Sequence, residues 1–290
     1  YNTDIRPVLD QSKMMEVRVT FSLVSIVEIN DVEQSFLING FLSFTWTDEI
    51  VAWNPNDYGG QVVIYPIPEK IWRPRIILMN TLADRDLFDD DKAPTVMLSN
   101  GETGWVPGSL FPTSCELNLT NYPFDRQTCI IELVAMRYIT EHLQFVAAFP
   151  NIELNYFITN GEWELQSTEL IIRNFSTGEN SALSCVQMKF FLKRRPAFLI
   201  LNIILPVVFL SFLNILVFVI PVESGEKIGY GITVLLALSV FMSIVSGMLP
   251  RSSLNMPNVT IYLFFLLFLS MLTVIDSIII VYLHHKEGVS

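Results

Sequence analysis

The chain has 290 residues, of which 51% are hydrophobic, and its mean hydropathy of +0.44 is high for a soluble protein. It contains 29 acidic residues against 18 lysines and arginines, which gives a formal net charge of −11. Such a chain concentrates cations near its surface and repels polyanions, so we expect no nucleic-acid partner.

Charge and hydropathy divide the chain into two parts. Residues 1–195 hold 25 of the acidic and 15 of the basic residues, whereas the remainder contains long uncharged stretches. We therefore expect a polar N-terminal domain over residues 1–195 and a membrane domain over residues 196–290. Export of the first domain requires a signal peptide, and Tyr1 is followed at once by polar residues, so we expect residue 1 to be a mature or trimmed start.

Residues 17–195 have the pattern of many short strands. Apolar residues at 17, 19, 21 and 23 alternate with polar ones, as in a half-buried strand. Further apolar runs are separated by turn-forming clusters such as Asn30-Asp31, Ser99-Asn100-Gly101 and Asn160-Gly161. Short strands at this spacing predict an all-β antiparallel sandwich.

Two of the three cysteines bracket a short segment. If Cys115 and Cys129 are bridged, they close a loop of 15 residues, which the chain-entropy model values at about 3 kcal/mol. Such a bridge requires an oxidising compartment. The third cysteine, Cys185, is expected to be a small buried apolar residue.

Two glycosylation sequons support an extracellular location for this domain. They begin at Asn118 and Asn174, and a third, at Asn258, adjoins an apolar stretch and is expected to stay unused. The basic residues 193–195 precede the first apolar stretch, and the positive-inside rule alone would place them in the cytoplasm. The sequons and cysteines outweigh them, because long domains translocate largely regardless of charge. We expect a multi-pass plasma-membrane protein whose N-terminal domain is extracellular.

Three stretches are long and apolar enough to cross a bilayer as helices. They lie at about 197–220, 228–249 and 259–283, and roughly 20 apolar residues cross the hydrocarbon core. The third contains one charged residue, Asp276. A carboxylate at this depth is costly, so we expect a buried protonated acid with a local hydrogen bond or, as the second interpretation, a modulatory or proton-sensing site.

The second stretch carries a stripe of a different character. Steps of three and four residues put its members on one helical face. The face begins with a carboxylate, continues with small and hydroxyl-bearing residues, reaches an apolar pair, and becomes small and polar again. Its members are Glu226, Gly229, Thr233, Leu236, Val240, Ser243 and Gly247. A helix facing only lipid has no use for such a stripe, so this face is predicted to line a water-filled pore.

Several motifs together resemble one family. The bracketed loop has thirteen residues between its cysteines and the sequence Tyr-Pro-Phe-Asp at 122–125, and tryptophan motifs occur at 46–48, 71–74 and 161–163. Over nearly its whole length the chain resembles the Cys-loop receptors, the pentameric ligand-gated ion channels, and most of all their nicotinic acetylcholine receptor branch. The resemblance implies the Cys115–Cys129 bridge. It also implies a homo- or heteropentamer in a lipid bilayer, opened by a small-molecule ligand and permeable to monovalent cations.

By this resemblance, five copies of the second span surround the pore, and this chain contains three of the family's four transmembrane helices. Glu226 then forms a ring of carboxylates at the cytoplasmic mouth, which favours cations. Leu236 stands at the hydrophobic gate, with Val240 one turn above it. Gly229 replaces the threonine or serine that relatives often carry in the narrow filter. The helix opens with Gly225-Glu226-Lys227 and no inserted proline, as in cation-selective members.

The resemblance implies a ligand site between subunits, where aromatic rings surround a cationic ligand. Here two of the expected aromatic positions hold Met79 and Met136. Phe41 stands where a tryptophan is common on the complementary side, and Tyr138 and Phe175 are the nearest other aromatics. This incomplete cage disfavours a choline-type ligand. A different amine, an apolar or acidic ligand, protons, or no classical agonist all stay open.

The resemblance also implies a relay between the sandwich and the spans. It comprises a strand turn, the cysteine loop, the residue before the first span and the segment after the second span. The expected members are Asp31, Val32, Phe124, Asp125, Arg195, Pro250 and Pro257. We expect Arg195 to form a buried ion pair with Asp31 or Asp125; the alternative is a solvated arginine near the lipid headgroups.

Other chemistry finds little support in the sequence. The acidic run from Asp84 to Asp91 is superficially similar to a calcium-binding loop, but Phe88 interrupts the ligand pattern. We expect a solvated loop there, with a weak divalent-cation site as the alternative, and no cofactor. No phosphate-binding loop, zinc-protease motif or nucleophile elbow occurs, so we expect no enzyme. Two further functions stay open: an accessory subunit that binds no ligand, and a membrane-anchored binding protein without conduction.

Overall fold

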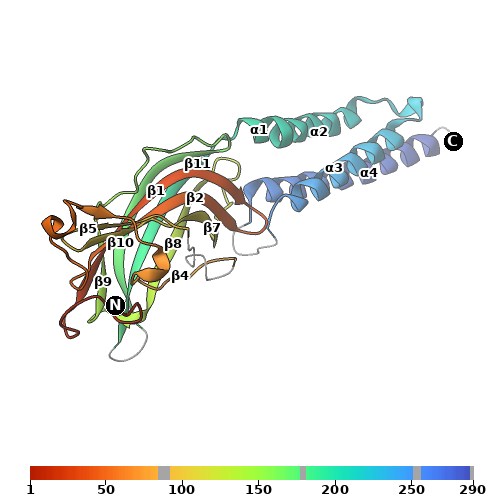
Figure 1. The fold of residues 1–290 in the computed structure, drawn as a ribbon. Helices are drawn as coiled ribbons and strands as arrows, with labels where there is room; N and C mark the ends of the chain where they lie inside the picture. The colour runs from red at the N-terminus through yellow and green to blue at the C-terminus, as the bar shows by residue number, and fades with distance from the viewer. Residues whose placement is uncertain (84–91, 177–180, 251–255, 288–290) are drawn as a thin grey trace. The chain divides into compact units, whose positions relative to one another are not determined.

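The computed structural model describes residues 1–83, 92–176, 181–250 and 256–287 (Figure 1). The acidic run at 84–91, residues 177–180 after Phe175, and part of the segment after the second span lie outside the described residues. The described chain forms two compact units. The first contains Tyr1–Asn30, Gln34–Glu116 and Gln127–Leu192, and the second contains Asp31–Glu33, Leu117–Arg126 and the chain from Lys193 onward.

The first unit is a β-sandwich, which confirms the predicted fold class. Among the described residues, one sheet has seven strands in the order β3–β5–β6–β2–β1–β9, with β7 beside β2, and the other has the order β10–β11–β8–β4 (Figure 1). The larger sheet consists of β1 (Met15–Asn30), β2 (Ser35–Thr47), β3 (Val63–Ile64), β5 (Thr95–Leu98), β6 (Glu102–Trp105), β7 (Gly108–Ser114) and β9 (Leu143–Ala147). The smaller consists of β4 (Ile76–Leu78), β8 (Arg126–Ile139), β10 (Trp163–Ser176) and β11 (Ala182–Arg194).

One strand pairing differs from the antiparallel pattern that was predicted. β9 runs parallel to β1, with Val17 opposite Phe145. The reason is that β8 and β9 are consecutive in the chain but lie in different sheets, so their short connection changes sheets and makes no hairpin. β2 pairs antiparallel with β1, β6 and β7.

Alternating residues of both sheets fill the core. The predicted face of β1 (residues 17, 19, 21 and 23) is almost completely buried. Phe190 of the smaller sheet contacts two rings of the larger one, with centroid distances of 6.3 Å to Phe21 and 5.3 Å to Phe36. Aromatic pairs at such distances add stabilisation beyond the area that they bury. These contacts hold the two sheets face to face.

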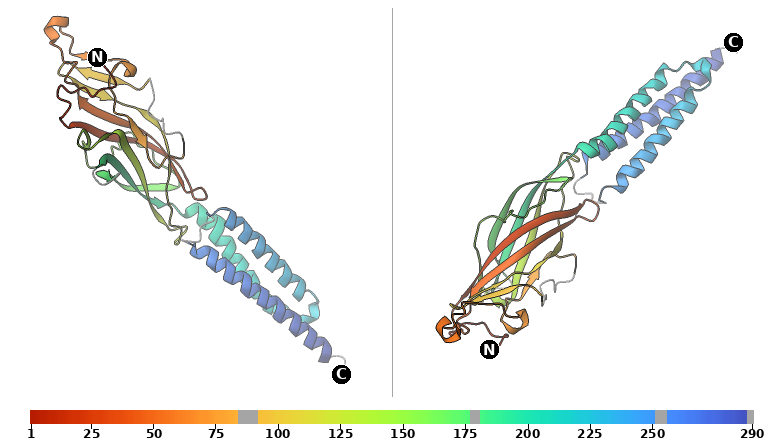
Figure 2. Two further views of the ribbon diagram at one scale, coloured as in Figure 1. Left: turned by 90° about the horizontal axis from the view of Figure 1, so that it is seen from below. Right: turned by 45° about the horizontal axis from the view of Figure 1, so that its top comes forward.

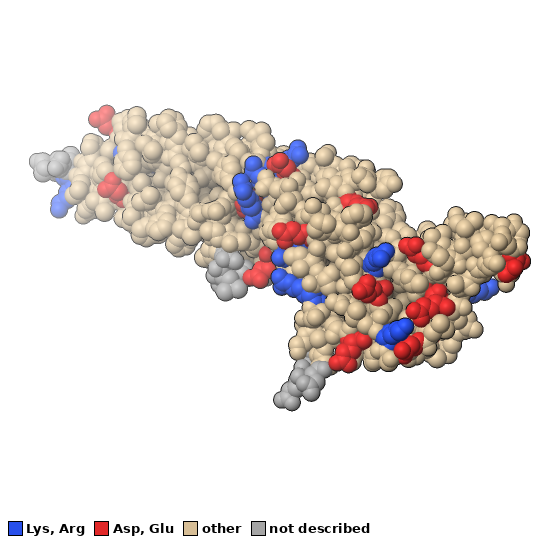
Figure 3. Space-filling view, turned by 90° about the vertical axis from the view of Figure 1, so that its left-hand side faces the viewer, with Lys and Arg blue, Asp and Glu red and all other residues tan. Residues whose placement is uncertain are grey.

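The second unit contains the helices. Among the described residues, three helices are long and apolar enough to cross a membrane by length and composition: Ala197–Val219, Lys227–Gly247 and Asn258–Lys286. Figure 2 shows them side by side, and Figure 3 shows charged side chains gathered over the strands and sparse over the helices. The first span comprises α1 (Ala197–Leu199), the π-helical η3 (Ile200–Ile204), α2 (Leu205–Leu216) and η4 (Val217–Val219); the others are α3 (Lys227–Gly247) and α4 (Asn258–Glu287).

The π-helical turn has a local cause in the sequence. Pro206 has no N–H group, so the carbonyl oxygen of Asn202, four residues earlier, has no α-helical donor. The chain adopts the wider π-helical turn at Ile200–Ile204, directly before this proline. The first span is therefore an α-helix with one irregular turn.

Gly231 lies where α3 packs against both of the other spans. A Cβ atom placed on it would be 3.2 Å from Cγ2 of Val274 on α4 and 4.0 Å from Cγ1 of Val217 on η4. We predict that Gly231→Leu destabilises the bundle by about 1–3 kcal/mol, because overpacking displaces these neighbours. Thermal unfolding of the purified protein in detergent measures the change. Gly247→Leu is the control, since a Cβ atom at Gly247 has no neighbour within 4 Å; equal melting temperatures of the two variants would contradict the prediction.

Candidate functional site

Helix α3 has a packed face and an exposed face. The buried residues are Lys227, Gly231, Val234, Leu238 and Val245. All seven residues of the predicted stripe, from Glu226 to Gly247, are exposed. Since an α-helix turns by about 100° per residue, the stripe and the buried residues lie on opposite sides. Helix α3 thus packs against its own chain through one side and leaves the stripe available to other molecules or to water.

The first residues of α3 separate two opposite charges. Gly225 has φ +71°, a left-handed conformation that glycine adopts without strain, and it turns the chain into the helix. Glu226 follows as the N-cap residue and is exposed, and its side chain makes no capping hydrogen bond. Lys227 is only 6% exposed and faces the packed side. The exposed face therefore carries the carboxylate without the neighbouring ammonium group.

The middle of the stripe is apolar. Leu236 is 62% exposed and Val240 is 52% exposed. About one turn before this pair, the Thr233 hydroxyl donates a hydrogen bond to the carbonyl oxygen of Tyr230 at 2.7 Å. The lone pairs of the hydroxyl oxygen therefore stay available on the exposed face. A band of large apolar side chains thus lies between hydroxyl-bearing turns.

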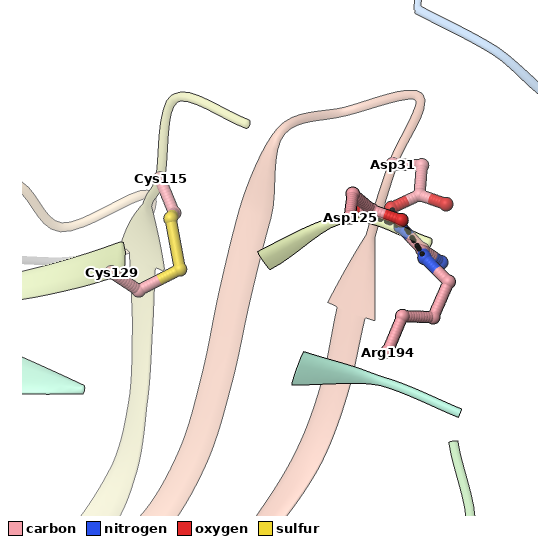
Figure 4. Close-up of polar contacts among 5 residues, drawn as sticks. All are labelled: Asp31, Cys115, Asp125, Cys129 and Arg194. Carbon is pink, nitrogen blue, oxygen red and sulfur yellow. Dashed lines mark hydrogen bonds and ion pairs between the residues drawn. A yellow bond between two sulfur atoms is a disulfide. The ribbon is translucent and has the colours of Figure 1, made fainter. Parts of the chain in front are cut away.

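A buried ion-pair cluster lies at the start of the helical unit. Arg194 binds Asp125 through two hydrogen bonds, from Nε at 2.8 Å and from Nη2 at 3.1 Å, and it binds Asp31 from Nη2 at 2.7 Å (Figure 4). Its guanidinium carbon lies 5.0 Å from the centre of the Tyr122 ring. Arg194 is only 6% exposed. Bidentate geometry and exclusion of water make this a strongly coupled cluster.

The prediction that Arg195 forms this ion pair is wrong by one residue. Arg195 is exposed, whereas Arg194 is buried. Side chains alternate along β11, so that Phe190, Leu192 and Arg194 share the inward face, and a shift by one residue moves a side chain to the opposite face. Counting from the buried phenylalanine would have identified the correct arginine.

The electrostatics of the cluster follow from two carboxylates facing one guanidinium group. Burial by itself would lower the pKa of Arg194, but the hydrogen bonds that Arg194 donates to Asp31 and Asp125 outweigh burial and raise that pKa. Burial raises the pKa of Asp31, an effect that Arg194 opposes and the nearby Asp125 reinforces. Arg194 therefore stays charged, and removing it would take the guanidinium group away from two largely buried carboxylates.

The other expected relay residues belong to the same unit as the helices. Val32 and Phe124 are exposed, Pro250 is half-buried and Pro257 is buried. Helix α4 begins beside the cysteine loop, because the Asn258 N–H donates to the carbonyl oxygen of Thr120 at 3.1 Å. The loop and the start of α4 are thus hydrogen-bonded to each other.

The predicted disulfide is confirmed. Cys115 and Cys129 are bridged (Figure 4) and close the loop between β7 and β8. Cys185 is free and buried, as expected. Burial and the neighbouring Glu132 raise the pKa of its thiol to about 11, which keeps it protonated and unreactive near neutral pH.

The predicted ligand residues are spread over both sheets. Phe41 lies on β2 of the larger sheet, and its ring covers Gly108 on β7, where a Cβ atom would be 2.5 Å from the ring. The other four lie on or next to strands of the smaller sheet. Met136 and Phe175 are exposed there. Within one chain these residues do not form a cage, and a shared site would need Phe41 from one subunit and the others from its neighbour.

Two of these residues are occupied within their own chain. Met79 packs against a small apolar cluster formed by Val134, Leu183 and Cys185, which Ile77 and Ile139 also cover. Tyr138 accepts a hydrogen bond from Trp72 Nε1 at 3.4 Å, and the guanidinium carbon of Arg6 lies 5.9 Å from the centre of its ring. Met79 therefore packs among aliphatic side chains of its own chain, and the Tyr138 ring already has the Arg6 guanidinium group beside it.

Asp276 is not buried. It is exposed on α4, on the side away from the buried Ser270, Val274 and Ser277. The expectation of a buried acid with a local hydrogen bond is thus wrong, because the helix turns its small polar residues inward and this carboxylate outward. The second interpretation, a modulatory or proton-sensing site, stays a prediction.

Comparison with known proteins identifies the family. The sequence model described as "Neurotransmitter-gated ion-channel ligand binding domain" matches residues 1–196, and the one described as "Neurotransmitter-gated ion-channel transmembrane region" matches residues 203–289. The chain belongs to the neurotransmitter-gated ion channel family. This is a family of channel subunits and not of enzymes, and its members are multi-pass plasma-membrane proteins with an extracellular N-terminal domain.

Individual relatives of this neurotransmitter-gated ion channel chain are subunits of acetylcholine receptors. Neuronal acetylcholine receptor subunit beta-4 of Bos taurus is 31% identical over 99% of the chain and 57% of its own length. Acetylcholine receptor subunit beta-like 1 of Drosophila melanogaster is 32% identical over 97% of the chain and 54% of its own length. Neuronal acetylcholine receptor subunit beta-3 of Rattus norvegicus is 31% identical over 99% of the chain and 62% of its own length. The chain thus spans somewhat more than half the length of these curated relatives.

The extracellular location predicts two glycans on this neurotransmitter-gated ion channel chain. Asn118 and Asn174 are exposed, and the N–H and hydroxyl of Thr120 both donate hydrogen bonds to Asn118 Oδ1. We predict that Asn118→Gln and Asn174→Gln each remove one glycan, which gel mobility before and after peptide N-glycosidase treatment measures. Asn258→Gln is the control and should leave the mobility unchanged; a shift in this variant alone would overturn the expected membrane topology.

Proposed function

We propose that the chain is a subunit of a pentameric, cation-selective channel whose pore is lined by α3 and opened by an extracellular ligand at the subunit interface. The observation that carries this proposal is the arrangement of charge on α3. Glu226 is exposed on the stripe, whereas Lys227 is buried on the opposite side. Five such helices would present five carboxylates to the pore without the adjacent ammonium groups, and this ring would attract cations and repel anions.

The apolar part of the stripe supports a gate. Rings of Leu236 and Val240 side chains would exclude water from a narrow passage and stop ions by dewetting. Both residues are more than half exposed in the isolated chain, so neither is needed for packing within the subunit. In a monomeric soluble protein, these apolar side chains would be exposed to water at a cost in free energy. In a pore, they would form the gate.

The Arg194 cluster supports coupling of the extracellular unit to the spans. Arg194 ends β11 shortly before the first span, Asp31 lies in the turn after β1, and Asp125 lies in the cysteine loop directly before β8. A movement of β1 or of β11 would therefore change the geometry of the same buried ion pairs. A network with two discrete arrangements of such pairs can transmit a conformational change.

A second candidate function is favoured by the apolar cluster around Met79. Because Val134, Leu183 and Cys185 are buried and Met79 packs on them, this face offers no open aromatic cage for an ammonium ligand. The chain would then be an accessory subunit that conducts ions but depends on a partner subunit for the ligand. Phe41 would still be available to contact a ligand held by the partner subunit, since it is 45% exposed on the other sheet.

Ion-substitution recordings test the proposal. The full-length protein is expressed in a cell line, alone and together with a ligand-binding family member, and the reversal potential is measured while external NaCl is diluted. A cation channel shifts its reversal potential toward the equilibrium potential of Na⁺, and a shift toward that of Cl⁻ would overturn cation selectivity. Current only in the mixed expression would favour the accessory subunit. Surface pentamers without current under any condition would contradict conduction itself.

A further inference from the structure

Gly229 lies beside the carboxylate of Glu226. A Cβ atom placed on Gly229 would have one neighbour within 4 Å apart from its own helix backbone, namely Oε2 of Glu226 at 3.8 Å. Both residues belong to the exposed stripe. The carboxylate therefore reaches forward along the first turn of α3 and lies next to the position that a side chain at residue 229 would occupy.

Glycine at residue 229 leaves the space beside this carboxylate open. Side chains of an α-helix ordinarily lean toward the N-terminus of the helix, but Glu226 is the N-cap residue, with φ −94° and ψ −9°, and its side chain makes no capping hydrogen bond. The positive end of the helix dipole favours a carboxylate near the first turn. With no side chain at 229 to obstruct it, the carboxylate can lie against that turn.

No ion pair within the described residues neutralises the charge on this carboxylate. Among the described residues Glu226 takes part in no ion pair, and the adjacent Lys227 is buried on the other side of the helix. The oxygen atoms are thus exposed and negative at the level of Gly229. A passing cation would meet them directly.

We propose that Gly229 is a positioning residue for Glu226. By lacking a side chain it lets the Glu226 carboxylates stand at the level of residue 229, so that carboxylate oxygens take the place of side-chain hydroxyls as the groups that contact small hydrated cations in the filter. This inference rests on the proposed function and deepens it, because it names the ion-contacting group and its height in the pore. A bulkier residue at 229 would displace the carboxylate by up to one helical turn.

The test compares single-channel conductance in two backgrounds. The parent carries Leu236→Thr so that it opens without a known agonist. We expect Gly229→Thr to lower the conductance roughly threefold, because it moves charge away from the ion path. Gly229→Ala should lower it less, since a Cβ atom 3.8 Å from the carboxylate oxygen is in ordinary contact. Glu226→Gln should lower it at least as much as Gly229→Thr.

The second background separates positioning from simple narrowing of the pore. In Glu226→Gln channels there is no charge to displace, so adding Gly229→Thr should lower the conductance little further. An equal fold-reduction in both backgrounds would mean that threonine acts by its bulk alone and would overturn the proposal. Ala237→Thr, which also introduces a threonine but at an exposed position outside the seven-residue stripe, should keep the parent conductance.

Failure of this inference differs from failure of the proposed function. Surface labelling first establishes that each variant reaches the membrane. A parent that conducts cations and loses conductance equally in both backgrounds contradicts the role of Gly229 only. A parent that reaches the surface and never conducts contradicts the proposal that α3 lines a conducting pore, and the inference about Gly229 is then contradicted as well.

Discussion

Arg194→Gln is expected to abolish ligand-evoked current and to destabilise the folded subunit by about 3–5 kcal/mol, because it removes the guanidinium group that pairs with two largely buried carboxylates. Asp125 is 2% exposed and Asp31 is 14% exposed, so water cannot replace the lost guanidinium group. Arg194→Lys should recover only part of the stability, since lysine cannot form the bidentate bond to Asp125. Thermal unfolding in detergent and surface labelling measure these effects.

Arg195→Gln is the matched control for this experiment. Arg195 is the next residue, has the same charge and is exposed, so its replacement should change the stability by no more than about 0.5 kcal/mol. The double variant Arg194→Gln with Asp31→Asn should be more stable than Arg194→Gln alone, because it removes one of the two carboxylate charges that faced the guanidinium group. If Arg195→Gln were as damaging as Arg194→Gln, the buried cluster would not be the cause.

Leu236→Thr is expected to raise the open probability without ligand by about tenfold or more, equivalent to about 1.4 kcal/mol shared by five subunits. A hydroxyl in each subunit stabilises water in the apolar ring and weakens the dewetting barrier. The measurement is the standing current at zero ligand, together with its block by a pore-filling cation. This is the largest functional gain that we expect from a single replacement.

Leu235→Thr makes the same chemical change one residue away. Leu235 is half-buried and lies about 100° from Leu236 around the helix, so it does not belong to the stripe. It should leave the unliganded open probability unchanged at equal surface expression. Similar standing currents in both variants would show that loosened packing, and not hydration of a gate, opens the channel.

The sequence was informative where a pattern repeats or a motif is long. Alternation predicted the buried face of β1 and hydropathy predicted three long apolar helices, because both depend on the local period of side chains. The cysteine loop predicted the disulfide through a resemblance. These features lie within short stretches, so no knowledge of distant contacts was needed.

Features that depend on register or on neighbours in space were less accessible. The arginine of the buried cluster was assigned one residue too late, since basic residues occupy 193–195 and hydropathy does not distinguish them. Asp276 was expected inside and lies outside, because a lone acid in an apolar helix does not reveal which side packs. The parallel pairing of β9 and the apolar cluster under Met79 involve strands distant in the sequence.

The segment from Leu117 to Arg126 has a mechanical consequence. Arg194 makes two kinds of contact near one end of this segment. Its side chain binds the Asp125 carboxylate, and its backbone N–H donates to the Asp125 carbonyl oxygen at 3.2 Å. Near the other end, the Thr120 carbonyl oxygen accepts the N–H of Asn258, the first residue of α4. One short loop is thus tethered to the start of the first span and to the start of the third. Tension on either helix is shared with the other through this loop, so the outer ends of these two spans should shift together as a stiff pair.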